Sequence, residues 1–166
     1  MAIIKTILGK TPAFGKDCFL AENSAIIGDV VMGDHCSVWY SCVIRGDVNT
    51  IRIGNNSNIQ DCSCIHATYK TGPVEIGNNV TIGHNVTVHA CTIDDGALIG
   101  MGSTLLDGCK IGKGAVVAAG ALVLQNTVIG DGELWGGVPA KFIKKAKTGQ
   151  AESFAEHYVM YKEWYK

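Results

Sequence analysis

The sequence has almost no net charge and no long apolar run, and each absence removes a class of function. A net charge of −1 over 166 residues, without a basic stripe, gives no electrostatic reason to expect nucleic-acid binding. The longest uncharged apolar run, residues 115–124, is too short to span a bilayer. Residues 1–10 lack the apolar core and the cleavage site of a signal peptide. We therefore expect a cytoplasmic protein with no nucleic-acid partner and no membrane partner.

The cysteines lack the even number and the regular spacing of a disulfide framework. The seven are Cys18, Cys36, Cys42, Cys62, Cys64, Cys91 and Cys109. Reduced thiols at small, buried wall or corner positions are the expectation. Cys62, Cys64 and His66 form a C-x-C-x-H run, which is not a usual structural zinc spacing, and no second cysteine pair lies nearby. A structural role is favoured over a soft-metal cluster.

Aliphatic residues recur at a spacing of six along most of the chain. The unbroken series is Ile93, Ile99, Leu105, Ile111, Val117, Val123 and Ile129. The same spacing connects Leu20, Ile26, Met32, Val38 and Ile44, then Ile53, Ile59 and Ile65, then Ile76, Ile82 and Val88. Neither an α-helix nor a strand alternation has a period of six, whereas a parallel β-helix with one short strand and one corner per hexad does.

These hexads predict an all-β solenoid whose aliphatic residues point inward. Eighteen hexads at three per coil correspond to about six coils of a triangular prism. A glycine-rich β-sandwich is the alternative, and a series of hexads without a slip disfavours it.

The end of the repeat sets the expected domain boundaries. We expect a solenoid over residues 1–135 and an exit segment over 136–149, because residues 130–139 are rich in glycine and contain a proline. The tail predicts an amphipathic helix over 150–166 that lies along its own prism or a neighbour's. Its apolar residues are Ala151, Phe154, Ala155, Tyr158 and Val159.

The hexad register predicts where three histidines lie on the prism. His66 comes directly after Ile65 and His89 directly after Val88, three hexads later, so both should stack on one outward face at about the 4.8 Å strand spacing. His84 comes two residues after Ile82 and should project from another side of the triangle. One chain does not easily bring His84 to the other two. Three chains with parallel axes can, as a trimer with three equivalent interfaces.

The same counting places polar neighbours around these histidines. Arg45 should stack under His66, and Asp61 is in register with His84, where its carboxylate would orient the imidazole. Gln60 would hydrogen-bond a metal-bound water. Three neutral imidazoles with room for water are typical of an open catalytic zinc site, which lowers the pKa of bound water to about 7.

At these residues the chain resembles the γ-class carbonic anhydrases, and the resemblance covers nearly its whole length. The matching segments are Arg45-Gly46-Asp47, Asn58-Ile59-Gln60-Asp61, Ile65-His66, Gly83-His84 through His89, Leu98-Ile99-Gly100-Met101-Gly102 and Gly137-Val138-Pro139-Ala140-Lys141.

The resemblance implies a left-handed β-helix that forms a homotrimer, with metal sites at the subunit interfaces. The expected metal is Zn²⁺, with Fe²⁺ or Co²⁺ as alternatives, and the expected ligands are His66, His84 and His89. The implied reaction is the reversible hydration of CO2 to bicarbonate by metal-bound hydroxide.

The resemblance also implies roles for the neighbouring side chains. Gln60 would position the hydroxide. Arg45 and Asp47 would form an intersubunit ion pair that Asp61 supports. Tyr158 on the tail helix would line the site.

The chain departs from the best-studied members at two places. It has Val48 where they have a glutamate, and residues 67–73 contain no carboxylate where they have an acidic loop with a proton-shuttling glutamate. Because CO2 hydration must export a proton in each turnover, the missing shuttle groups predict weak activity.

Two other classes of function stay open. One is acyl chemistry, as a hexapeptide-repeat acyltransferase or a metal-dependent thioesterase with a histidine base. With three histidines assigned to the metal, only His35 and His157 remain for that role, and neither lies in a recognisable acceptor motif. The other is a metal-binding protein without turnover.

Overall fold

The computed structural model describes residues 1–147 and 149–165, and for residues 150–152 it describes the backbone alone. Thr148 in the expected exit segment, the side chain of Ala151 and the expected last helical residue, Lys166, therefore lie outside the described part of the chain.

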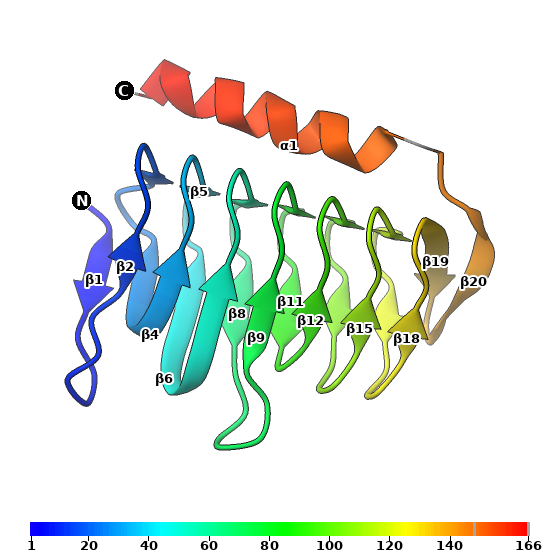
Figure 1. Cartoon of the computed structure of the whole chain (residues 1–166), viewed down its shortest axis with the longest axis horizontal. Coiled ribbons are helices and arrows are strands. Elements are labelled where there is room, and N and C mark those ends of the chain that lie inside the picture. The colour runs from blue at the N-terminus through cyan, green and yellow to red at the C-terminus, as the bar shows by residue number, and fades with distance from the viewer. Residues whose placement is uncertain (148, 166) are drawn as a thin grey trace.

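The chain forms a left-handed parallel β-helix with three faces and one helix outside it, as the hexads predicted (Figure 1). The helix face, covered by the helix, consists of β3 (Phe19–Leu20), β5 (Ser37–Val38), β7 (Asn58–Ile59), β10 (Thr81–Ile82), β13 (Leu98–Ile99), β16 (Val116–Val117), β19 (Glu133–Gly137) and β20 (Ala140–Lys145). The histidine face consists of β1 (Ile3–Lys5), the first parts of β4 (Ala25–Met32) and β6 (Val43–Ile53), β8 (Cys64–His66), β11 (Thr87–His89), β14 (Thr104–Leu105) and β17 (Leu122–Val123). The third face consists of β2 (Ala13–Phe14), the last parts of β4 and β6, β9 (Val74–Ile76), β12 (Thr92–Ile93), β15 (Lys110–Ile111) and β18 (Val128–Ile129).

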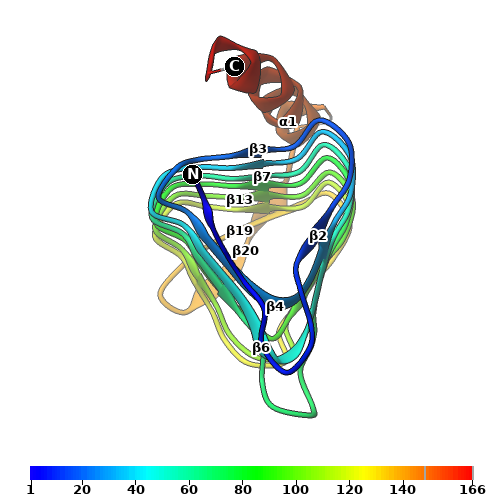
Figure 2. The same ribbon diagram turned by 90° about the vertical axis from the view of Figure 1, so that its left-hand side faces the viewer.

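The solenoid has about seven coils, one more than the hexads indicated. Viewed along its axis, the coils stack as triangles with the helix outside one side (Figure 2). The additional strands lie at the two ends. β1 and β2 pair in parallel with β4, and β19 pairs in parallel with β16. None of these strands contributes one of the counted hexads, because an open strand edge accepts a partner without requiring that sequence pattern.

The aliphatic hexad residues form the core, as predicted. All of them except Leu20 are at most 4% exposed. Leu20 is partly exposed because it lies near the open end of the prism, where fewer residues cover it. Burial of one aliphatic side chain per strand gives every coil the same hydrophobic contact with the next.

At most corners the backbone is left-handed three residues after the inward aliphatic residue. Gly108 has φ +72° and follows Leu105 by three residues, and Asn126 has φ +59° and follows Val123 by the same step. Glycine and asparagine adopt this conformation at little cost, which explains why these residue types recur at the corners.

Two segments interrupt the regular coils. Residues 67–73 form a hairpin that projects from the corner between the histidine face and the third face, with a bridge between Thr68 and Gly72 (Figure 1). At the other end, β20 turns back antiparallel to β19. The expected exit segment therefore extends the helix face by one more strand before the chain leaves the prism.

The tail packs on its own prism, which settles a point that the sequence left open. Helix α1 (Gln150–Tyr161) runs along the helix face toward the N-terminal coils and continues as the 3-10 helix η1 (Lys162–Tyr165) (Figure 1). Ala155 is buried at 2% exposure, whereas Phe154 of the expected apolar stripe is 42% exposed. Lys162 is fully buried, and its Nζ lies 2.9 Å from Oδ2 of Asp17.

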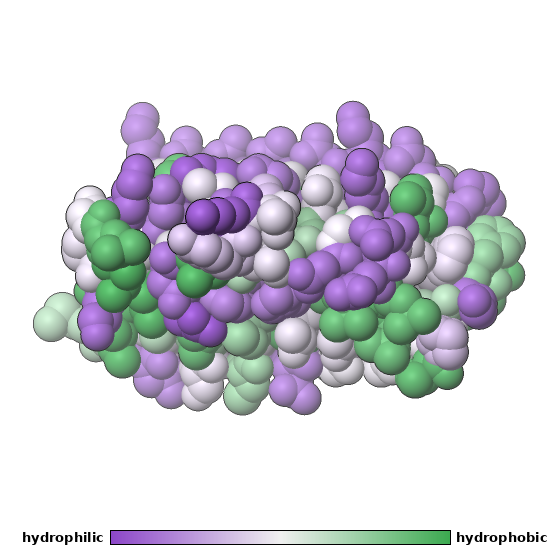
Figure 3. Space-filling model, turned by 90° about the horizontal axis from the view of Figure 1, so that it is seen from below, coloured by the Kyte–Doolittle hydropathy of each residue, from purple (hydrophilic) through white to green (hydrophobic). Residues whose placement is uncertain are grey.

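The surface opposite the helix is largely polar, with apolar patches toward both ends of the solenoid (Figure 3). Exposed apolar side chains include Leu8 near the N-terminus and Val128 in β18. Within the described ranges, no helix has the length and apolar character that a membrane crossing needs.

Candidate metal centre

His66 and His89 lie side by side on the histidine face, in the register that the hexads predicted. The two are direct partners in the parallel pair β8–β11, and Arg45 is the partner of His66 on the other side. Nδ1 of His66 lies 3.2 Å from Nε2 of His89. The two ring centroids are 5.2 Å apart.

The carboxylates around this pair determine which ring nitrogens carry hydrogen. Nε2 of His66 lies 3.1 Å from Oδ1 of Asp47, and Nδ1 of His89 lies 2.6 Å from Oδ1 of Asp107. A carboxylate only accepts hydrogen bonds, so in the neutral rings these two nitrogens donate. The remaining nitrogens, Nδ1 of His66 and Nε2 of His89, then turn their lone pairs toward each other.

This arrangement fits a metal ion. Two imidazole nitrogens bound to one tetrahedral Zn²⁺ at 2.0–2.1 Å are about 3.3–3.4 Å apart, close to the observed separation of 3.2 Å. Two lone pairs that face each other repel, and a cation between them removes the repulsion.

The contact of Asp107 with His89 was not predicted from the sequence, although the hexad register gives the position of Asp107. It follows Leu105 by two residues, and Leu105 lies one coil after Val88, so Asp107 comes close to His89 from the next coil. Thr68 of the projecting hairpin donates its hydroxyl hydrogen bond to the second carboxylate oxygen, Oδ2. The Thr68 bond, together with the His89 contact, holds the pKa of Asp107 below its usual value despite the opposing effect of burial.

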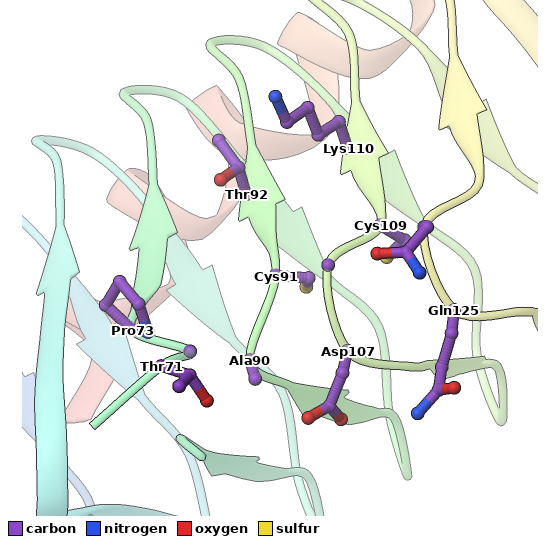
Figure 4. Close-up of a pocket in the computed structure, with 12 residues that line it drawn as sticks. Thr71, Pro73, Ala90, Cys91, Thr92, Asp107, Cys109, Lys110 and Gln125 are labelled. Atoms are coloured by element: carbon purple, nitrogen blue, oxygen red, sulfur yellow. The ribbon is translucent and has the colours of Figure 1, made fainter. Parts of the chain in front are cut away.

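A groove of about 360 Å³ lies beside Asp107. The close-up shows Asp107 between Ala90 and Gln125, with Thr71 and Pro73 of the hairpin at the opposite side of the groove (Figure 4). Solvent therefore reaches the carboxylate that holds His89.

Asp47 connects His66 to Arg45. Nη1 of Arg45 lies 2.6 Å from Oδ2 of Asp47, whose other oxygen faces His66. Burial raises the pKa of Asp47, and the hydrogen bonds from Arg45 and His66 outweigh it, so that the pKa is lower than usual. The resemblance implied an ion pair between subunits. Within one chain the two side chains already form a pair, because residues two apart on strand β6 point to the same side. An ion pair between subunits stays a prediction.

His84 lies on a different side of the prism, two residues after strand β10, and it is paired with Asp61 as the register predicted. Its Nδ1 lies 2.9 Å from Oδ2 of Asp61, and the backbone N–H of Tyr40 donates to Oδ1 of the same carboxylate at 3.1 Å. Asp61 therefore holds His84, on a different side of the prism from the Arg45–Asp47 pair that the resemblance expected it to support. Each of the three histidines has a carboxylate on one ring nitrogen, which is the common arrangement around metal-ligating histidines.

One chain does not assemble all three histidines. Among the side chains described, those of residues 1–147, 149 and 153–165, no three His, Cys, Asp or Glu side chains of one chain come together as a metal-binding group.

Gln60 lies in the same region as His84, and a hydrogen bond to a neighbouring side chain fixes the orientation of its amide. Its Nε2 donates to Oδ1 of Asn58 at 3.1 Å, and Nδ2 of Asn58 donates to the hydroxyl of Thr81 at 2.9 Å. All three side chains are buried on the outer side of the helix face. With its nitrogen committed to Asn58, Gln60 offers its carbonyl oxygen, Oε1, as an acceptor.

Tyr158 reaches this region from α1. Together with Gln60 and His84 it lines a largely apolar cavity of about 330 Å³ between the helix and the helix face. Burial raises the pKa of Tyr158 to about 12, and the nearby charge of Asp61 adds to the effect. Trp39, which the sequence did not single out, packs edge-on against Tyr158 with ring centroids 5.4 Å apart.

Fold and site together define a hexapeptide-repeat solenoid with carboxylate-held histidines on two of its faces. A family model described as bacterial transferase hexapeptide (six repeats) matches residues 90–125. The chain superimposes on a crystal structure of a hexapeptide transferase family protein from Anaplasma phagocytophilum with a TM-score of 0.94. The two are 37% identical, and the match covers 99% of this chain and 98% of that one.

Named relatives show which family of hexapeptide-repeat proteins the chain is similar to. A protein of Methanocaldococcus jannaschii named probable carbonic anhydrase is 49% identical, over 88% of this chain and 91% of that protein. The mitochondrial γ carbonic anhydrase 2 of Arabidopsis thaliana is also 49% identical, over 86% of this chain. The chain spans only 53% of the length of that plant protein. The chain belongs to the γ-class carbonic anhydrase family.

Proposed function

We propose that the protein is a γ-class carbonic anhydrase-like lyase that catalyses the reversible hydration of CO2 to bicarbonate in the cytoplasm. The observation that carries this proposal is the distance of 3.2 Å between Nδ1 of His66 and Nε2 of His89, with the other ring nitrogens held by Asp47 and Asp107. The names of the relatives point to the same class of enzyme.

The proposed site is shared between copies of the chain. His66 and His89 of one subunit and His84 of its neighbour would bind one Zn²⁺, with Fe²⁺ or Co²⁺ as alternatives, in a homotrimer with three equivalent interfaces. Bound Zn²⁺ supplies Lewis acidity that lowers the pKa of water to about 7, so that a nucleophile is present at neutral pH. The imidazoles are already oriented by their carboxylates, so metal binding would require little reorganisation.

The remaining side chains position the reactants. Gln60 is placed to accept a hydrogen bond from the attacking water through Oε1, because Asn58 fixes its amide. The apolar cavity beside His84 and Tyr158 would admit CO2, which has no net charge and no dipole, more readily than water. Because residues 67–73 contain no carboxylate, proton export remains the slow part of the proposed cycle.

Acyl transfer is the second candidate, and one observation favours it. His157 of α1 lines the same apolar cavity as His84, where a histidine base would be needed. The other histidine outside the candidate metal centre is His35. Its Nδ1 lies 3.1 Å from Oδ2 of Asp17, and this contact does not point to a catalytic role. A metal-dependent thioesterase is a variant of this candidate, and a metal-binding protein without turnover is the third reading.

Stopped-flow measurement of CO2 hydration tests the proposal. The protein is purified without oxygen and reconstituted with Zn²⁺ or Fe²⁺, and the His84→Ala variant is the matched control. We expect hydration above that of the variant, at a modest rate. About one metal ion per chain with no hydration above that of His84→Ala would reject the carbonic anhydrase function and leave the acyl and binding functions.

A further inference from the structure

A second cavity, which shares Tyr158 and Tyr161 with the apolar cavity beside His84, is lined almost entirely by aromatic rings. It has a volume of about 230 Å³ and lies between the corner after β5 and the end of the tail. Its lining residues, called the aromatic cage below, are Trp39, Tyr40, Asp61, Tyr158, Tyr161, Trp164 and Tyr165. Six of the seven are aromatic and the seventh is a carboxylate. Asp61 and Tyr158 also belong to the proposed lyase site, whereas the other five have no part in the proposed reaction.

The rings meet at steep angles and therefore form walls. Trp39 packs against Tyr158 with an interplanar angle of 80° and against Tyr165 with one of 86°. Tyr158 and Tyr161 meet at 68°. Such edge-to-face contacts are a preferred packing of aromatic rings, and they orient the rings around the cavity in different directions.

The outer rings of the cage are exposed although the tail is already anchored. Trp164 is 70% exposed and Tyr165 is 52% exposed. The ion pair of the buried Lys162 with Asp17 and the buried Ala155 attach the tail to the prism. Tyr165 also packs against Trp39 of the prism, and the exposed parts of Trp164 and Tyr165 are available to contact a ligand.

The electrostatics of the cage favour a cation. Asp61 is the charged lining residue, and the lining contains no lysine or arginine in the part of the chain that the structure describes. The pKa values of two tyrosine hydroxyls in the cage are raised, as expected from burial and from nearby negative charge. Burial first and then the charge of Glu22 raise the pKa of Tyr40, and burial first and then Asp61 raise that of Tyr158 to about 12. The faces of tyrosine and tryptophan rings carry negative potential as well.

We propose that the aromatic cage binds a small organic cation of the quaternary or methylated ammonium class. Aromatic walls attract such a cation through cation–π interactions, and a single carboxylate adds a charge without demanding a donor that a quaternary nitrogen lacks. The volume suits a head group of this kind and is below that of a typical drug-sized pocket. Asp61 belongs to both the cage and the pair with His84, so the ligand would lie near the candidate metal centre.

Choline binding by isothermal titration calorimetry tests this proposal on the full-length protein without added metal. The matched ligand is 3,3-dimethyl-1-butanol, which has the same shape and no charge. We expect saturable binding of choline, and binding of the neutral alcohol that is about tenfold weaker or undetectable.

Two exposed positions give a matched pair of variants. Trp164→Leu removes one wall of the cage at a surface position, and we expect it to weaken choline binding about tenfold. Phe142→Leu alters an aromatic residue in β20 that is 51% exposed and does not line the cage, and it should bind choline as the unmodified chain does. Thermal unfolding of both variants checks that each is folded.

Three results would overturn the proposal: no saturable binding of choline, equal binding of choline and the alcohol, or unchanged binding by Trp164→Leu. None of these measurements depends on CO2 hydration or on bound metal. A failure of the cage therefore leaves the proposed lyase function untouched, and a failure of that function leaves the cage untouched.

Discussion

Replacement of Asp107 by asparagine should weaken metal binding while the fold is kept. Asp107 is the side chain that sequence counting did not find, and its Oδ1 lies 2.6 Å from Nδ1 of His89. Asparagine keeps the size and one acceptor but removes the charge that favours the donor form of Nδ1. The lone pair of Nε2 on His89 then becomes a weaker ligand.

The expected size of the effect follows from the contact and its exposure. Loss of a carboxylate partner from a metal-ligating histidine typically costs 10- to 100-fold in metal affinity, which is about 1.4–2.7 kcal/mol. The Asp107 side chain is 34% exposed, so that solvent already screens part of its charge. We therefore expect the lower end of this range, about a tenfold increase in the Kd for Zn²⁺.

Competition with a chromogenic chelator at fixed pH measures this Kd. Asp131→Asn is the matched control, since Asp131 also lies at a corner and its carboxylate accepts a backbone hydrogen bond from Lys113 at 2.9 Å instead of holding a histidine. A Zn²⁺ affinity of Asp107→Asn within about twofold of both the unmodified chain and the control would refute the role assigned to Asp107.

Two further predictions concern stability. Asn58→Ala should lower the free energy of unfolding by about 1–3 kcal/mol in urea titrations, because the buried amide of Gln60 and the hydroxyl of Thr81 each lose a partner; a change below about 0.5 kcal/mol would contradict it. The pKa of Glu133 is lowered from 4.5, chiefly by hydrogen bonds from Trp135 and from the backbone of Gly130. Its contribution to stability should therefore be present above about pH 4.5 and be lost as the pH falls through the lower folded-state pKa. The melting temperature of Glu133→Gln, followed from pH 6 to pH 3, should fall less than that of the unmodified chain, and parallel curves would contradict this.

The regular part of the fold could be predicted because one inward aliphatic residue per hexad repeats with little variation. That periodicity determines which residues stack, so the partnerships of His66 with His89 and of Asp61 with His84 follow from counting. The end strands do not follow from it. β1 and β2 pair with β4 through backbone hydrogen bonds, which place little demand on side chains.

The contacts that could not be predicted from the sequence join residues that do not stack directly above one another in the hexad register. Asp107 lies one position beyond the residue directly above His89 and reaches it diagonally, and Thr68 reaches Asp107 from a hairpin that has no hexad register. The aromatic cage combines a corner after β5 with a 3-10 turn at the end of the tail. The helix period does not extend into that turn, so the positions of Trp164 and Tyr165 could not be read from it.

The central claim is that each metal site takes ligands from two copies of the chain, and mixed trimers test it most directly. His66→Ala chains and His84→Ala chains each lack a ligand at every site, so either variant alone should bind little Zn²⁺. When the two are unfolded together and refolded as a mixture, sites between an intact His66–His89 pair and an intact His84 should reappear and bind Zn²⁺. Recovery of Zn²⁺ binding in the mixture is the result that we predict, and a mixture that binds no more Zn²⁺ than the separate variants would contradict a shared site.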